Sequence, residues 1–228
     1  GGYVVTAVLF ELLFDYGWLK GAPVYVASLD PGGPVDAWDA TVVAVTALAV
    51  MFLTLHLDVW PLSRSRRVMR QPVLGLAWTA LSLGVAVVLY VLGTRTLGMT
   101  PPGFLVTVPV PFIFGSVVLL NMLQGTVFAG RSQPVKGALG AVTAMVVGTV
   151  LALLYRVLMP LVTGDLASGP PAFDAELWLA NALLAVTFPF FAFHGDYFRL
   201  WPLAGPPERE DDATTTPGTG TELAGAPS

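Results

Sequence analysis

The sequence contains no cysteine. Disulfides, zinc–thiolate sites, thiolate-held iron–sulfur clusters and cysteine nucleophiles are therefore excluded for these 228 residues. Histidine is almost as scarce, since His56 and His194 are the only two. So few imidazoles argue against a haem protein with several bis-histidine sites.

Charged side chains are also scarce. They make up 11% of the residues, whereas a soluble domain carries about 25%. Hydrophobic residues make up 55% of the chain, and the mean hydropathy is +0.73. The composition therefore predicts an integral membrane protein in contact with the lipid bilayer. The net charge of −4 argues against a nucleic-acid partner.

The apolar residues fall into runs of membrane-spanning length. A hydrocarbon core about 30 Å thick is crossed by roughly 20 helical residues. We therefore predict an all-α, polytopic transmembrane helical bundle within residues 1–203. Its six expected spans are approximately 3–18, 41–57, 72–93, 104–123, 137–162 and 177–193. The segment 204–228 is polar and rich in Pro, Gly and Thr, which predicts a disordered tail.

The loops between these runs differ in charge. The stretch 58–71 is basic, with Arg64, Arg66, Arg67 and Arg70, and 124–137 adds Arg131 and Lys136. The stretches 19–40 and 163–176 are mainly acidic, with Asp30, Asp36, Asp39, Asp165, Asp174 and Glu176. Because Lys and Arg favour the cytoplasmic side, we predict a plasma (inner) membrane protein with a cytoplasmic C-terminus. The loops 19–40 and 163–176 are then outside.

Short motifs recur in a consistent register. QPVLG at 71–75 and QPVKG at 133–137 open the third and fifth spans. WPL at 60–62 and 201–203 follows the second and sixth, and GGPVDAWDA at 32–40 resembles SGPPAFDA at 168–175 before the same two spans. LAVMF at 48–52 likewise resembles LAVTF at 184–188. The recurrence predicts two-helix hairpins repeated in the same orientation.

This register places residues 1–18 in the second half of a hairpin. We therefore expect a preceding helix upstream of Gly1, in a longer reading frame that continues the same protein.

Three charged residues fall inside the expected spans. Glu11 and Asp15 are separated by four residues and share one face of the first helix, while Arg156 lies at similar depth in the fifth. Charges within a membrane are costly and are usually functional or paired. They are candidates either for a proton- or cation-linked acid pair tuned by Arg156, or for a structural ion pair.

A His-x-Asp pair ends both the second and the sixth span. His56 with Asp58, and His194 with Asp196, could together form a metal site or a proton relay. Residues two apart do not face each other on a helix, so each pair could chelate only beyond the helix end. The alternative is capping, because a cation near a helix C-terminus is favoured by the helix dipole. No resident cofactor is identified by the sequence.

Several residues mark irregular or close-packed positions in the spans. Pro109 and Pro111 in the fourth span and Pro189 in the sixth are expected to kink them, as packing features or as parts of a binding site. Asn121, Gln124 and Asn181 are polar residues in or at the ends of spans, available for hydrogen bonds between helices. The small residues of the fifth span predict close helix packing: Gly137, Gly140, Ala141, Ala144 and Gly148.

These features favour a transporter or permease-like protein, or a membrane subunit of a transport system. One alternative is a membrane-embedded enzyme subunit using the His/Asp residues, and another is a non-catalytic structural subunit. The expected partners are other membrane subunits or an upstream part of the same protein. The substrate stays open.

Overall fold

The computed structural model describes residues 32–123, 126–128 and 130–187, together with isolated positions before and after these ranges. All regular secondary structure in this part of the chain is helical. Four of its helices are long and apolar enough to cross a membrane: Ala37–His56, Val73–Thr96, Pro101–Leu120 and Val135–Thr163. They correspond to the second to fifth predicted spans, which confirms the prediction of a helical, membrane-type chain.

The six-span bundle is not established as a whole. The first predicted span, 3–18, and the tail, 204–228, lie outside the described residues apart from isolated positions in the span. The sixth is described without a gap only to Thr187, as α7 (Asp174–Ala182) followed by a π-helical segment, Leu183–Thr187.

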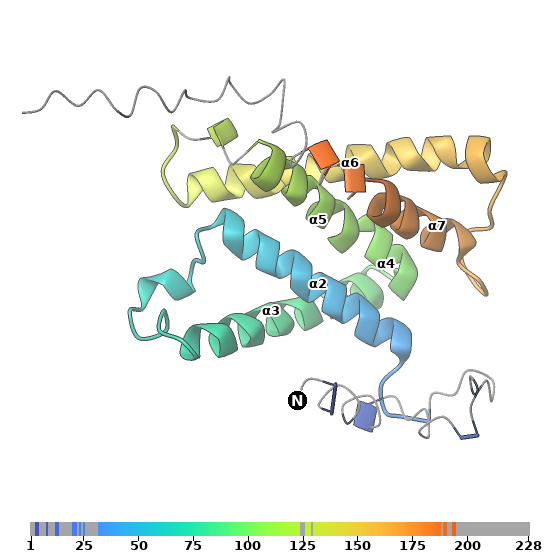
Figure 1. Cartoon of the computed structure of the whole chain (residues 1–228), viewed down its shortest axis with the longest axis horizontal. Coiled ribbons are helices and arrows are strands. Elements are labelled where there is room, and N and C mark those ends of the chain that lie inside the picture. The colour runs from blue at the N-terminus through green and yellow to red at the C-terminus, as the bar shows by residue number, and fades with distance from the viewer. Residues whose placement is uncertain are drawn as a thin grey trace, which may run out of the picture.

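Two helices form the first hairpin. α2 (Ala37–His56) begins earlier than predicted because the Asp36 carboxylate accepts hydrogen bonds from the N–H groups of Trp38 at 2.8 Å and Asp39 at 3.2 Å. The chain then turns through a 3-10 segment, Leu62–Arg64, into α3 (Val73–Val91), which a π-helical segment extends to Thr96. Figure 1 shows α2 and α3 side by side, with the basic turn at the left end.

The fourth span is divided. α4 (Pro101–Thr107) ends at Val108, where φ is −115° and ψ is −74°, and α5 (Pro109–Val117) begins at the next residue. A π-helical segment continues to Met122. The break follows from the prolines, because Pro109 and Pro111 have no N–H to donate to the carbonyls of Leu105 and Thr107.

This broken span is the centre of the bundle. In its apolar stretch 67% of the residues are buried, against 11% for Val73–Thr96. Its side chains pack with Val42 of α2 and Leu183 of the sixth span, both 0% exposed. The outer faces of α3 and α6 instead carry exposed aliphatic side chains, as expected of helices that face lipid.

Close packing joins α5 to α6 (Val135–Thr163). A Cβ at Gly148 would overlap the backbone carbonyl of Pro111, and a Cβ at Gly115 would overlap that of Ala144. The two backbones therefore meet at glycine on both helices. Gly137, Gly140, Ala144 and Gly148 of the predicted small-residue stripe are buried, and Ala141 is half-buried.

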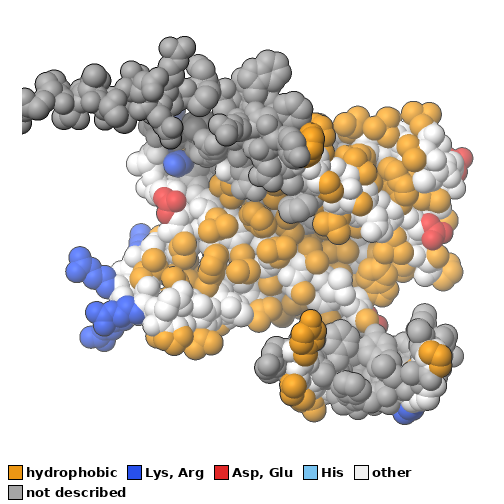
Figure 2. Space-filling model, viewed as in Figure 1, with side chains coloured by type: hydrophobic (Ala, Val, Ile, Leu, Met, Phe, Trp, Pro, Cys, Tyr) orange, Lys and Arg blue, Asp and Glu red, His pale blue; other side chains and the backbone are white. Residues whose placement is uncertain are grey.

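The two ends of the bundle differ in charge. Figure 2 shows most of the Lys and Arg side chains at the left end and most of the Asp and Glu side chains at the right. The left end holds the α2–α3 turn and the start of α6, and the right end holds the starts of α2, α4 and α7 (Figure 1). The helices thus bring the basic stretches to one end and the acidic stretches to the other.

Candidate functional site

A cavity of about 140 Å³ lies near the acidic end, between α4, α6 and α7. Its lining combines apolar residues with one cation, one carboxylate and two hydroxyls. The lining residues are Gly103, Val106, Thr107, Arg156, Met159, Ser168, Ala175, Glu176 and Leu179. We call it the outer cavity.

Arg156 supplies the positive charge of the outer cavity. It stands seven residues before the end of α6, about 10 Å along the helix axis. The 29-residue helix is about 43 Å long, so a hydrocarbon core of about 30 Å centred on it would end close to Arg156. From that depth a long side chain can keep its charged group in contact with water.

The predicted acidic partners of Arg156 are not placed. Glu11 and Asp15 lie outside the described residues. The acid that shares the cavity with Arg156 is instead Glu176, in the first turn of α7. The sequence placed Glu176 only in an acidic loop, because no spacing pattern connects it to Arg156, 20 positions earlier.

Glu176 is held by the loop that precedes it. Its carboxylate accepts a hydrogen bond from the Ser168 hydroxyl, and the Gly169 N–H approaches its two oxygens at 3.2 and 3.3 Å. Burial raises the pKa of Glu176, but these hydrogen bonds and the positive charge of Arg156 outweigh burial and lower the pKa below its usual value. The outer cavity therefore contains a carboxylate that stays ionised at neutral pH.

The break in the fourth span adjoins this cavity. Thr107, the last residue of α4, lines it, and the Thr107 hydroxyl donates to the Gly103 carbonyl at 2.7 Å. The Thr107 carbonyl lacks its usual helical donor because Pro111 has no N–H. Backbone acceptors of this kind are tolerated at membrane depth where they line a cavity.

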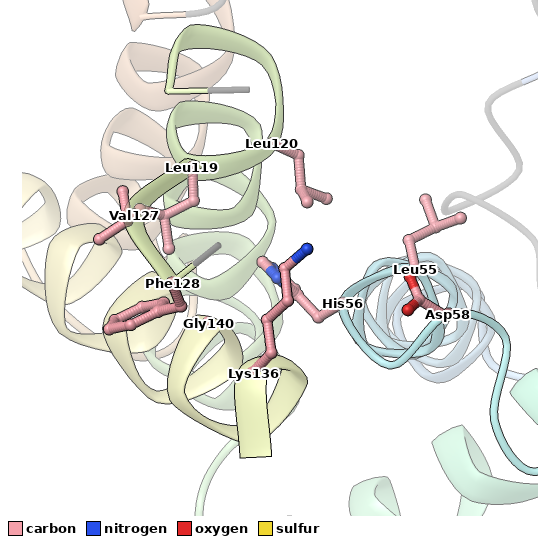
Figure 3. Close-up of a pocket in the computed structure, with 9 residues that line it drawn as sticks. All are labelled: Leu55, His56, Asp58, Leu119, Leu120, Val127, Phe128, Lys136 and Gly140. Atoms are coloured by element: carbon pink, nitrogen blue, oxygen red, sulfur yellow. The ribbon is translucent and has the colours of Figure 1, made fainter. Parts of the chain in front are cut away.

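A second, smaller cavity of about 90 Å³ lies at the basic end (Figure 3). His56, Asp58 and Lys136 give it polar groups, and Leu55, Leu119, Leu120, Val127, Phe128 and Gly140 complete its lining. His56 ends α2 and is only 7% exposed. Its Nε2 lies 3.1 Å from Ser116 Oγ on α5, and Gly140 leaves room for the ring, since a Cβ there would be 2.9 Å from Nδ1.

Gln133 connects α2 to α6 at the basic end of the bundle. Its amide Nε2 donates to the His56 carbonyl at 3.0 Å and to Asp58 Oδ2 at 2.8 Å, while Oε1 accepts from the Gly137 N–H at 3.0 Å. One side chain thus joins the end of α2 to the start of α6. The QPVKG motif marked this position but did not indicate its partners, and Ser116 was visible only as an isolated polar residue in an apolar run.

The predicted His/Asp cluster is only partly described. Among the residues that the structure describes, no group of three or more His, Asp or Glu side chains could hold a metal ion. His56 and Asp58 contact Ser116 and Gln133 respectively, while His194 stacks near Phe190 with ring centroids 6.4 Å apart. Asp196 lies outside the described residues, so the four-residue site stays a prediction.

The remaining predicted positions have varied surroundings. Asn181 is exposed and donates to the Leu177 carbonyl of its own helix at 2.8 Å. Asn121 lies in the π-helical end of the fourth span, where only its backbone is described. Gln124 lies outside the described residues. Pro189 is helical and exposed, two residues after the π-helical segment of the sixth span.

No protein-family model, curated protein or solved structure matches this chain.

Proposed function

We propose that the chain is a transporter or permease-like membrane protein, or a membrane subunit of a transport system. The observation that carries the proposal is the divided fourth span. The most buried of the apolar helices is also the broken one, and its break lies beside a cavity with two opposite charges. Broken helices beside charged cavities are how membrane transporters form solute sites within the bilayer.

The proposed orientation places the basic end of the bundle in the cytoplasm of a cell with a plasma (inner) membrane. The exposed Arg64, Arg66, Arg67 and Arg70 of the α2–α3 turn support it, together with Lys136 at the start of α6. The outer cavity then opens to the exterior, the loops 19–40 and 163–176 are outside, and the tail is cytoplasmic.

We also propose that the spans are hairpin repeats that have diverged. Pro72 and Pro134 precede α3 and α6 with nearly the same backbone angles, φ −86° and ψ −1° against φ −89° and ψ −3°. Trp38 and Phe173, at matching positions of the two acidic motifs, contact each other edge to face with centroids 6.3 Å apart. Other membrane subunits are the proposed partners of this chain.

Solute uptake into proteoliposomes tests the function. The panel would contain small cations, anions and zwitterions, each radiolabelled. We expect one class to accumulate above protein-free liposomes and Arg156→Gln to reduce that uptake about tenfold or more, because the cavity loses its only cation. Arg95→Gln is the matched control, since Arg95 is also near the acidic end but does not line the cavity. Equal background leakage for every solute in both proteins would contradict a transport function.

A further inference from the structure

The two charges of the outer cavity share its lining without pairing. Among the contacts of the described residues, none joins the Arg156 guanidinium directly to the Glu176 carboxylate, whose oxygens accept from Ser168 and Gly169 instead. Both side chains nevertheless line the same space. Two opposite charges left apart in one cavity can be satisfied together by a ligand that carries both signs.

The size of the cavity sets the size of that ligand. A cavity of about 150 Å³ in another protein accepts benzene, which has six non-hydrogen atoms. The outer cavity, at about 140 Å³, has nearly the same volume. It therefore suits a molecule of about six non-hydrogen atoms.

The remaining lining agrees with a short, weakly apolar body between two charged groups. Val106, Met159 and Leu179 offer aliphatic contact, and Leu179 is 7% exposed. Gly103 and Ala175 complete this lining without adding a polar side chain. The polar ends of a ligand would meet Arg156 on α6 and Glu176 on α7.

We infer that the outer cavity binds a small zwitterion of the α-amino acid class, with its carboxylate on Arg156 and its ammonium on Glu176. This inference rests on the proposed transport function and names its substrate class. Arg156 is suited to the carboxylate because its guanidinium presents several N–H donors in one plane. Glu176 is suited to the ammonium because the Ser168 and Gly169 contacts fix its position before the ligand arrives.

Binding of L-alanine to the purified full chain tests the inference by isothermal titration calorimetry. Propionate and ethylammonium serve as probes that each lack one of the two charges. We expect L-alanine to bind at least about tenfold more tightly than either probe, because each probe can contact only one of the two charged side chains. Arg156→Gln and Glu176→Gln should each weaken alanine binding about tenfold or more.

Two controls keep this test specific. Arg95→Gln and Asp165→Asn remove charges of the same signs near the acidic end but outside the cavity lining, and should leave alanine binding unchanged. Unfolding temperatures without ligand would establish that the cavity variants are folded. Propionate binding as tightly as alanine, or no alanine binding by folded protein, would overturn the zwitterion inference.

The failure of this inference and that of transport are distinguishable. Uptake of another solute class without alanine binding would reject the zwitterion and leave transport standing. Charge-dependent alanine binding without uptake of any solute would reject transport and leave the zwitterion site standing.

Discussion

Replacing Gly148 with alanine is expected to unfold or severely destabilise the protein. The new Cβ would overlap the Pro111 carbonyl, which belongs to the backbone and cannot rotate away. Because Ala144 and Gly115 form a second close contact along the same pair of helices, α5 and α6 would have to separate. Overpacking of a well-filled core costs about 1–3 kcal/mol, and a backbone clash belongs at the upper end of this range or above it. Thermal unfolding in detergent would measure the loss.

Gly84→Ala is the matched control. Gly84 lies in α3, and a Cβ added there meets nothing within 4 Å. Alanine has a higher helix propensity than glycine, so this variant should be as stable as the parent or slightly more stable. Equal unfolding temperatures for Gly148→Ala and Gly84→Ala would refute the close α5–α6 packing.

Replacing Gln133 with alanine should cost about 2 kcal/mol of stability. The change removes the amide that caps the His56 carbonyl and binds Asp58, and the acceptor for the Gly137 N–H. Groups left without partners in a half-buried setting lose more than the average hydrogen bond contributes. Chemical denaturation followed by tryptophan fluorescence would report the change.

Gln71 provides the comparison because it occupies the same place in the other Gln-Pro motif. Its side chain is exposed, and its Oε1 would be in ordinary contact, at 3.5 Å, with a Cβ on Gly75. Gln71→Ala should therefore change stability by less than about 0.5 kcal/mol. If both variants lost the same stability, Gln133 would not be the connection between α2 and α6 that its contacts indicate.

Much of the fold could be predicted from the sequence because the bilayer imposes strong rules. Four predicted spans coincide with apolar helices, with ends shifted by a few residues where local chemistry decided. The N-cap Asp36 lets α2 begin at Ala37, before the predicted start at residue 41. Thr100 and Pro101 likewise let α4 begin before the predicted start at residue 104. The break in the fourth span falls at Pro109, because the effect of a missing N–H is local.

The recurring motifs show that sequence similarity does not determine how deeply a residue is buried. Val50 in LAVMF is 4% exposed, whereas its counterpart Val186 in LAVTF is 55% exposed and lies in a π-helical segment. α2 packs against α3 and the divided fourth span, and Val50 lies on its covered face. Equivalent motifs thus occupy different surroundings, and burial depends on those surroundings rather than on the motif.

The candidate site was the least predictable feature. Arg156 could be selected because a charge in an apolar run is costly, but its neighbour Glu176 looked like an ordinary loop acid. Both residues line the outer cavity because α6 ends and the chain returns through a loop to α7, a tertiary arrangement that periodicity does not encode. Ser116 and Gln133 were missed for the same reason, since their partners are 60 and 77 positions away.

Thiol labelling of single-cysteine variants tests the orientation and the outer cavity together, because the 228 residues contain no cysteine of their own. Single cysteines would replace Ala167 in the acidic loop, Ser63 in the basic turn, Thr107 in the outer cavity and Val150 on the exposed face of α6, near the middle of that helix. In intact cells, a membrane-impermeant maleimide should modify Ala167→Cys and Thr107→Cys. It should reach Ser63→Cys only after permeabilisation, and Val150→Cys in neither case, because lipid covers that face. Labelling of Ser63→Cys in intact cells, or a Thr107→Cys as unreactive as Val150→Cys, would contradict a cytoplasmic basic end and a water-filled outer cavity.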